Sequence, residues 1–371
     1  MTSRSVVGTS TSSGRHPVSV SSARPTSRLR RTLVAAATAT AVLALAACGS
    51  DDSADDTSGD SSSAPAAEAG AFPVTITGAL GETTIDEAPE RVVTLGWGSS
   101  DIALSLGVVP VGIETDAWAG DEDGYQPWFR DAVEEQGAEL PTTIEMYPEL
   151  DVEAVIALEP DLILAPQSGL DQATFDQLSE FTNVVAYPEG PWITPLDEQV
   201  EIAATALGVP DAAQPLLDEV DTTLADAAAE HPEFADVSVA YVASQELGTL
   251  AAYVPGDPRV DMLTGLGFQL APSVADLTAP EGLFTADIGL ENSDVLSDVD
   301  VLFTWFNDET EQAATEAQPL FASIPAFASG AYVPMVDRQL GMAVTVSTPL
   351  SVPWAIDKYV PMISEAVAKV G

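Results

Sequence analysis

Residues 211–230 read DAAQPLLDEVDTTLADAAAE, and their apolar side chains recur at three- and four-residue steps. That spacing places the apolar side chains on one face of an α-helix and leaves the acidic residues on the other faces. Pro210 and Asp211 form a start signal, and Pro232 lies just beyond the end. At about 1.5 Å per residue, this helix is a rod of roughly 30 Å, the diameter of a small domain. It is either a rigid link between two α/β lobes or a crossover helix inside one large domain.

The charge of the chain is strongly one-sided. Its 371 residues include 58 Asp and Glu against 12 Lys and Arg, which gives a formal net charge of −46. Six of the basic residues precede Cys48, whereas no acidic residue does. Such a surface repels nucleic acid and anionic lipid, so we expect neither as a partner. The length is sufficient for two domains.

Cysteine and histidine are too scarce for several kinds of site. Cys48 is the single cysteine, so an intrachain disulfide is excluded. Of the two histidines, His16 lies near the N-terminus, which leaves only His231 for the body of the protein. One histidine is too few for a His-rich metal site, and it leaves no Ser-His or Cys-His pair for nucleophilic catalysis. We therefore expect a binding protein rather than an enzyme, with no metal bound directly by its side chains.

The N-terminal segment has the pattern of an export signal. Arg28-Leu29-Arg30-Arg31 precedes the apolar run TLVAAATATAVLALAA (32–47), which is shorter than the ~20 residues of a membrane-spanning helix. The run ends in Leu45-Ala46-Ala47-Cys48-Gly49, which resembles the bacterial lipobox. The resemblance implies a signal peptide over residues 1–47 and a lipid on Cys48. We thus expect an extracytoplasmic protein anchored to the cell membrane through that lipid alone.

The body of the protein follows a polar, acidic segment over residues 48–71, which we expect to be a disordered tether. Short apolar runs then alternate with helical patterns, which indicates mostly parallel sheets flanked by helices. We predict an N-terminal lobe over 72–208, the linking helix over 209–232, and a C-terminal lobe over 233–371. The aromatic-rich stretch from Glu114 to Pro148 is predicted to be a long irregular loop, of the kind that is usually functional or disordered.

Three groups of segments carry a family resemblance. They are APERVVTLGWGSSDIALSLGVVPVGI (88–113), LDVEAVIALEPDLILA (150–165), and the closing pair FASIPAFASGAYVPMVD (321–337) and STPLSVPWAIDKYVP (347–361). In order and spacing they resemble the iron–siderophore substrate-binding proteins of ABC importers, a periplasmic binding protein family with a single linking helix. This resemblance implies an α/β fold of two lobes, each a mostly parallel sheet flanked by helices, joined by one long α-helix. It also implies a ligand cleft between the lobes.

The resemblance further implies how the protein meets its importer. In such proteins one surface glutamate on each lobe docks on arginines of the membrane permease, because charges far apart fix orientation and speed encounter. Glu153 and Glu291 match this pattern, each in a short helix ahead of an aspartate and an apolar strand. An acid in the first turn of a helix also simply suits the helix dipole, so the match has a structural alternative. We expect an ABC permease as partner and a monomeric protein.

Candidate ligand-binding residues are the aromatic and basic side chains near strand ends, where open α/β sheets place their ligands. They are Trp97, Tyr253, Arg259, Trp305 and Arg338. Aromatic faces suit a bulky chelate, and arginine can hydrogen-bond its oxygens. Because cations are so few, a hydroxamate siderophore is favoured over a tri-anionic catecholate. Iron would arrive already chelated, so no cofactor is expected.

Three other functions compete with this one. The same fold could bind haem or a corrinoid, and only the cleft would differ. A carboxylate hydrolase is not excluded by counting acids, although no carboxylate pair or phosphate-binding loop stands out. The fold could also serve as a non-catalytic interaction protein of the cell envelope, in which case no small ligand would bind.

Overall fold

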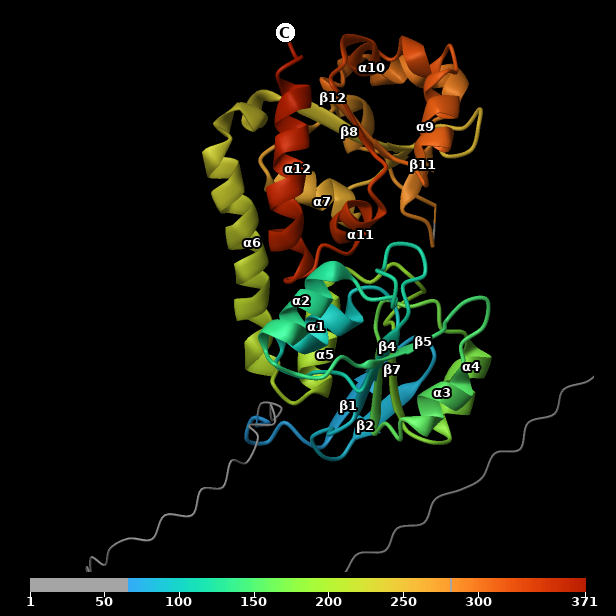
Figure 1. Cartoon of the computed structure of the whole chain (residues 1–371), viewed down its shortest axis with the longest axis vertical. Coiled ribbons are helices and arrows are strands. Elements are labelled where there is room, and N and C mark those ends of the chain that lie inside the picture. The colour runs from blue at the N-terminus through green and yellow to red at the C-terminus, as the bar shows by residue number, and fades with distance from the viewer. Residues whose placement is uncertain (1–65, 281) are drawn as a thin grey trace, which may run out of the picture. The chain divides into compact units, whose positions relative to one another are not determined.

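Two sheets organise the computed structural model, which describes residues 66–280 and 282–371 (Figure 1). Cys48, the predicted signal peptide and most of the predicted tether lie outside the described residues. The described residues belong to one compact unit. Within them, no helix is both long enough and apolar enough to span a bilayer.

The first sheet is five-stranded and entirely parallel, in the order β5-β4-β3-β6-β7. A separate antiparallel hairpin of β1 and β2 precedes it. The strands are β1 (Val74–Thr77), β2 (Glu82–Ile85), β3 (Val92–Thr94), β4 (Gly112–Glu114), β5 (Thr142–Ile144), β6 (Leu162–Ala165) and β7 (Asn183–Ala186). The helices are α1 (Ser99–Ser105), α2 (Pro127–Glu135), α3 (Val152–Ala157), α4 (Gln172–Ser179) and α5 (Leu196–Ala206).

Alternation along the strands builds a core on each face of this sheet. In β6, Leu162 and Leu164 pack on the side of α1 and α5, whereas Ile163 and Ala165 pack on the side of α3 and α4. Figure 1 shows these two helix pairs on opposite sides of the strands. Since both faces are covered, the strands read as continuous apolar runs, which is how a buried parallel sheet appears in sequence.

The prediction of a long irregular loop from Glu114 to Pro148 is wrong. This stretch contains helix α2 and strand β5, which pairs with β4. Pro127 occupies the first turn of α2, and Trp128, Phe129 and Val133 form its buried face. The apolar stripe of α2 contains only three residues, which is too short to show a helical period in the sequence. The polar and aromatic residues on either side also resemble those of a loop.

Helix α6 (Ala213–Glu230) joins the lobes, and a 3₁₀ turn, η1 (Pro210–Ala212), precedes it. One stripe of its side chains serves both lobes. Ala213 and Leu216 pack in the core of the first lobe, and Val220 and Leu224 pack in the core of the second. The long linking helix between two α/β lobes is thereby confirmed, and the crossover alternative is excluded.

The second sheet is mixed, with the order β11-β9-β8-β12-β13 and with β10 paired to β8. Pairings of β8 with β10, of β8 with β12 and of β12 with β13 are parallel, whereas those of β9 are antiparallel. The strands are β8 (Ser238–Ala243), β9 (Ala251–Tyr253), β10 (Gln269–Leu270), β11 (Thr285–Asp287), β12 (Val301–Trp305) and β13 (Tyr332–Met335).

The helices of the second lobe also cover both faces of their sheet. Side chains of α7, α11 and α12 pack with Tyr241 and Phe303 on one face, and those of α8, η3 and α10 pack with Ala240 and Leu302 on the other. The α-helices are α7 (Pro258–Gly265), α8 (Pro272–Ala275), α9 (Glu309–Glu316), α10 (Pro325–Ser329), α11 (Arg338–Val346) and α12 (Ser351–Val367). The 3₁₀ segments are η2 (Pro232–Asp236), η3 (Leu290–Asp298) and η4 (Phe321–Ser323).

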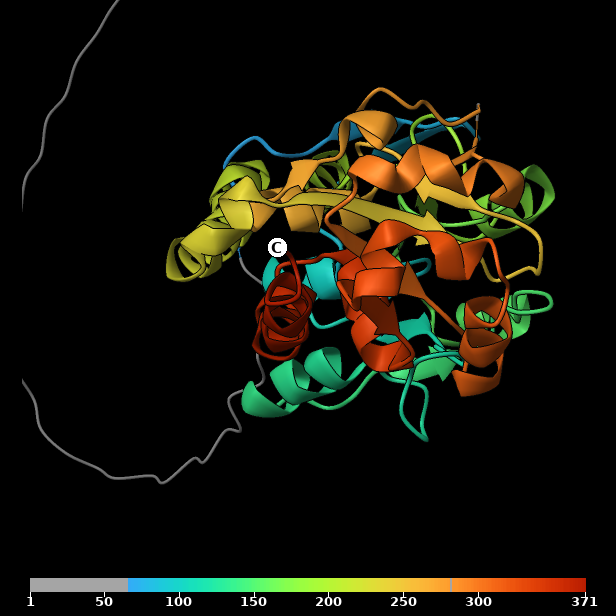
Figure 2. The ribbon, with the colours of Figure 1, turned by 90° about the horizontal axis from the view of Figure 1, so that it is seen from above.

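The hydrophobic core of the second lobe continues into the first. Trp128 and Phe129 of α2 belong to the same buried cluster as Val352 and Tyr359 of α12. The rings of Trp128 and Trp354 lie 5.2 Å apart, and Figure 2 shows α12 beside α2. The lobes are therefore held by packed side chains as well as by the linking helix.

Candidate ligand-binding site

Two adjoining cavities lie between the lobes. The first, of about 550 Å³, is lined by Trp97, Trp118 and Trp128 of the first lobe and by Trp305 of the second. The second, of about 1000 Å³, extends toward α6 and is lined by Trp192, Phe284 and the α6 side chains Val220 and Leu224. Both cavities share three lining residues, namely Trp97, Arg259 and Thr345. Together they form a cleft large enough for a drug-sized or larger ligand.

The backbone around Trp97 is built to hold its indole in the cleft. Trp97 follows β3, and its neighbours Gly96 and Gly98 have φ values of 85° and 77°. A Cβ at Gly96 would stand 2.3 Å from the carbonyl oxygen of Gln167, so only glycine fits there. The Trp97 N–H donates to that same carbonyl at 3.0 Å, which ties this turn to the loop after β6.

Trp192 contacts Trp97, and both line the second cavity. Their ring centroids lie 4.9 Å apart at 45°. Trp192 adopts a φ of 65°, which costs a non-glycine residue about 1–3 kcal/mol and persists only where its surroundings impose it. Gly169 leaves room for the indole, since a Cβ there would approach it to 2.8 Å. Strain at a residue that lines a cavity is a typical mark of a functional position.

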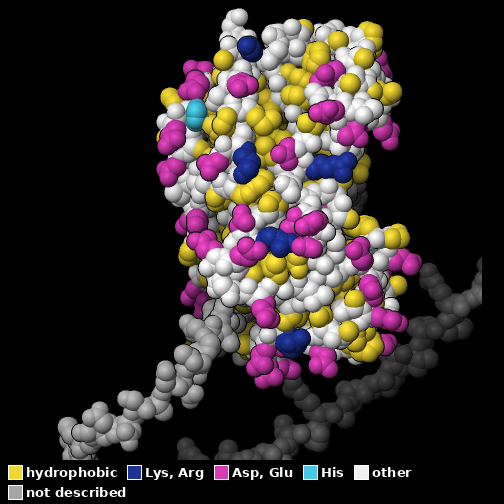
Figure 3. All heavy atoms as spheres, viewed as in Figure 1, with side chains coloured by type: hydrophobic (Ala, Val, Ile, Leu, Met, Phe, Trp, Pro, Cys, Tyr) yellow, Lys and Arg dark blue, Asp and Glu magenta, His cyan; other side chains and the backbone are white. Residues whose placement is uncertain are grey.

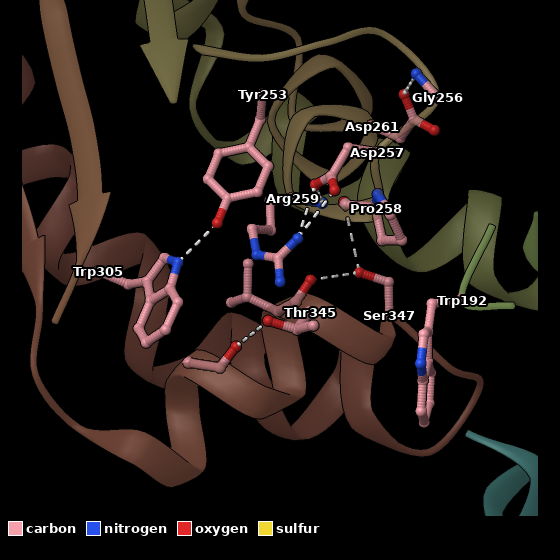
Figure 4. A network of polar contacts seen from close by, with 12 residues as sticks. Trp192, Tyr253, Gly256, Asp257, Pro258, Arg259, Asp261, Trp305, Thr345 and Ser347 are labelled. Carbon is pink, nitrogen blue, oxygen red and sulfur yellow. Dashed lines mark hydrogen bonds and ion pairs between the residues drawn. The ribbon is translucent and has the colours of Figure 1, made fainter. Parts of the chain in front are cut away.

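Arg259 lines both cavities, and Figure 4 shows its guanidinium between Tyr253 and Asp257. It is only 7% exposed, and its Nη1 donates to Asp257 at 2.8 Å. The guanidinium stacks 4.5 Å from the ring centroid of Tyr253, whose hydroxyl accepts a hydrogen bond from Trp305 at 2.7 Å. Among the described residues only Asp257 accepts a hydrogen bond from this guanidinium, so Nε and Nη2 are available to a ligand.

Two other residues predicted to bind the ligand, Tyr253 and Arg338, lie farther from the cleft than Trp97 and Arg259 do. Tyr253 lines neither cavity, but it supports Arg259 and Trp305 from behind. Arg338 also lines neither cavity and is exposed, with its guanidinium 5.7 Å from the ring of Trp118. Its Nε donates to the carbonyl oxygen of Asn307, whose side chain accepts a hydrogen bond from Trp118 at 2.9 Å. A role for Arg338 in ligand binding stays a prediction and would act through Trp118.

Carboxylates also line the first cavity. Burial and the neighbouring charge of Asp116 raise the pKa of Glu114 to about 7, against the lowering effect of a hydrogen bond from the Gly96 N–H. Burial also raises the pKa of Asp101 to about 6, although hydrogen bonds from Thr348 and Trp128 oppose the shift. Asp101 thus bridges the lobes, because Thr348 belongs to the second and Trp128 to the first.

Sequence reasoning missed several of these residues, yet part of the signal was present. Trp192 follows strand β7 just as Trp97 follows β3, so the rule that placed Trp97 at a strand end applies to it equally. Trp118, Trp128 and Tyr147 were visible as the aromatic content of the stretch from Glu114 to Pro148. Glu114 and Asp101 carried no sequence signal among 58 acidic residues.

The two glutamates predicted to dock on a permease are both exposed. Glu153 lies in the first turn of α3, where Asp151 already caps the helix by accepting from the Ala154 N–H. Glu291 lies in η3, so the short helix predicted there is a 3₁₀ helix. The aspartates that follow these two glutamates play matching roles, since Asp161 and Asp300 each accept an N–H at the start of a neighbouring strand, from Arg91 and Ser238 respectively.

The remaining candidate chemistry does not lie in the cleft. His231 follows α6, where it pairs with Glu233 at 3.0 Å and stacks on Phe234. Over residues 66–280 and 282–371, no group of three or more His, Cys, Asp or Glu residues is arranged to hold a metal ion.

Comparison with known proteins agrees with this architecture. The profile of the family described as periplasmic binding protein matches residues 92–333. The ferric enterobactin-binding periplasmic protein FepB of Escherichia coli is 28% identical over 275 residues, which cover 70% of this chain and 83% of FepB. The crystal structure of Streptococcus pneumoniae PiaA in complex with ferrichrome has a TM-score of 0.72 at 29% identity, covering 80% of this chain and 99% of PiaA. A periplasmic solute binding protein of Mycobacterium smegmatis has a TM-score of 0.66 at 29% identity, covering 79% and 98% of the respective chains.

Proposed function

Because the chain belongs to the periplasmic binding protein family, we propose that it captures a ferric siderophore between its lobes and delivers it to an ABC importer. The observation that carries this proposal is Arg259, a buried guanidinium at the junction of two aromatic cavities whose Nε and Nη2 donate to no acceptor among the described residues. A ferric chelate presents ring or chain carbon to the indoles and acceptor oxygens to the arginine. The ligands named for FepB and PiaA are chelates of this general kind.

A hydroxamate chelate fits the charge of this cleft better than a catecholate. Arg259 is the only Lys or Arg among the described residues that line the two cavities, and its charge is already balanced by Asp257. A chelate with three negative charges would enter a cleft that has carboxylates and no free cation to offset them. A neutral or cationic ferric hydroxamate avoids that cost. The relatives leave this choice open, since FepB is named for ferric enterobactin and PiaA was crystallised with ferrichrome.

Anchoring and delivery complete the proposed function. A lipid on Cys48 would keep the protein beside its permease and raise its effective concentration there. Glu153 and Glu291, one on each lobe, would then orient the loaded protein.

Tryptophan fluorescence tests the proposal directly. Five of the six tryptophans line the cleft, so a bound ferric chelate should quench much of the emission. The purified protein would be titrated with ferric hydroxamates, ferric catecholates, haem and cobalamin, and with each chelator free of iron. Saturable quenching by a ferric hydroxamate, and not by its iron-free form, is expected. Quenching by haem or cobalamin alone would move the function to those ligands, and no response to any compound would contradict ligand capture.

A further inference from the structure

The first cavity contains chemistry that a neutral chelate would leave unused. Building on the proposed function, we propose that this cavity binds a positively charged amine group of the chelate, so that the preferred ligand is a ferric hydroxamate with an ammonium arm. The chelate body would lie at Arg259 and against Trp97 and Trp192, and the arm would enter between the lobes.

The cavity is rich in carboxylates that lack a cationic partner. Asp101, Glu114, Asp116 and Glu145 line it, and none of them forms a salt bridge with another described residue. Among the described residues that line this cavity, the single cation is Arg259, which pairs with Asp257. A bound ammonium would therefore be the first opposite charge that these four side chains meet.

Burial makes this absence of a partner significant. Asp101 is only 2% exposed and accepts hydrogen bonds from Trp128 and Thr348, whereas Glu114 is half-buried and accepts a single hydrogen bond, from the Gly96 N–H at 2.8 Å. A carboxylate removed from water loses hydration that one hydrogen bond does not replace. A cation brought into the cavity would restore that loss, whereas an anion or a neutral group would not.

The remaining walls are also suited to an organic cation. The indoles of Trp97, Trp118, Trp128 and Trp305 line the cavity, and the rings of Trp118 and Trp305 meet edge to face with centroids 5.6 Å apart. Indole faces attract ammonium groups by cation–π interaction. A bare metal ion fits less well, because it requires several oxygen ligands at close range and no such group occurs among the described residues.

A matched pair of ligands isolates the charge of the arm. A linear ferric trihydroxamate with a terminal primary amine would be compared with the same chelate after acetylation of that amine, by fluorescence titration at about pH 8, where Glu114 is mostly ionised. The amine form should bind at least about tenfold more tightly. Glu114→Gln, which keeps an acceptor for the Gly96 N–H, should remove most of this preference. Glu219→Gln, on the exposed face of α6, should retain it.

The outcomes separate this proposal from the proposed function. If both chelates bind equally well, the cation site is wrong and siderophore capture stands. If neither binds, siderophore capture fails, and the cation site is judged with small probes: millimolar pentylammonium should change the tryptophan emission saturably, whereas pentanol should not. An equal response to pentylammonium and pentanol, or to pentylammonium in the wild type and in Glu114→Gln, would overturn the cation site as well.

Discussion

At the scale of single residues, Asp101 makes a prediction about stability and pH. Its pKa is raised from 3.8 to about 6 by burial, so the folded state holds this proton more tightly than the unfolded state does. The carboxyl therefore contributes stability that is fully present below about pH 4 and is lost as the pH rises through 6. Asp101→Asn keeps an acceptor for Trp128 and Thr348 without the charge. Through this carboxyl, the free energy of unfolding of the wild type should fall by about 2–3 kcal/mol between pH 4 and 7. Asp101→Asn should lack that fall.

Chemical denaturation at several pH values measures this effect. Glu114, whose pKa is also raised, adds a decline of the same sign at slightly higher pH, so Asp101→Asn should flatten the profile only in part. Glu219→Gln should leave the pH dependence of the free energy of unfolding unchanged, because this side chain is exposed. If the free energy of unfolding falls equally with pH in Asp101→Asn and in the wild type, then the pKa of Asp101 is not raised in the folded protein.

Arg259 makes a second prediction, about affinity. Lysine in its place would keep the charge that pairs with Asp257 but would lose the planar set of N–H donors. Arg259→Lys should therefore weaken binding of the ferric chelate by about 10- to 100-fold, with little change in melting temperature. Arg338→Lys is the matched control, and it should change affinity by less than about threefold, because Arg338 lines neither cavity. Equal losses in the two variants would mean that Arg338 reaches the ligand.

Sequence was a good guide to some of these residues and a poor guide to others. Trp97 and Arg259 were predicted because each follows a strand end and because cations are rare in this chain, and both line the cavities, whereas their contact with a ligand stays a prediction. Tyr253 and Arg338 were predicted by the same reasoning, yet they lie behind the cavity walls. Sequence position indicates which end of a strand a side chain occupies, but the direction of a side chain depends on packing that only the folded lobes create.

At the scale of elements, α6 and the core between the lobes predict limited closure. A helix whose buried stripe enters both cores cannot bend without exposing apolar surface, and the contact of Trp128 with Trp354 adds a second restraint. Small-angle scattering should therefore show little compaction when ligand is added, in contrast to hinge-type binding proteins. Trp354→Ala, which removes one ring of the contact between α2 and α12, should increase the compaction that ligand causes. A large compaction of the wild type would contradict the rigid link.

Helices and strands were predictable where their patterns were long, and they were missed where the patterns were short. The apolar period of α6 extends over five turns and was read correctly, whereas α2 buries three side chains and was taken for a loop. Glu291 was predicted to lie in a short helix, and that helix is η3, a 3₁₀ segment with non-helical backbone at Asn292 and Leu296. Hydrogen-bond pattern within such a short segment depends on its tertiary neighbours, which a sequence pattern does not record.

At the scale of the whole molecule, the family and the two-lobed fold could be derived from segments scattered over most of the chain, because their order and spacing had to agree. The acidic surface could be anticipated too, and Figure 3 shows Asp and Glu side chains spread across the visible face with few Lys and Arg. The pairing of carboxylates with indoles in one cavity could not be anticipated. Asp101 of α1 and Glu114 of β4 meet only when the first lobe folds, and Trp305 of the second lobe joins them only when the lobes approach.

That acidic background defines how the docking prediction must be tested. Glu153→Ala combined with Glu291→Ala should abolish uptake of iron from the ferric chelate in cells that carry no other copy, while the purified variant keeps its affinity, because both side chains are exposed and neither lines a cavity. General loss of charge is a competing cause in a protein with 58 acids. Glu180→Ala with Glu365→Ala removes one exposed acid from each lobe as well and should leave uptake normal. If the two double variants transport equally well, or equally badly, then the orientation on the permease does not depend on Glu153 and Glu291, and the docking surface must be sought elsewhere on the lobes.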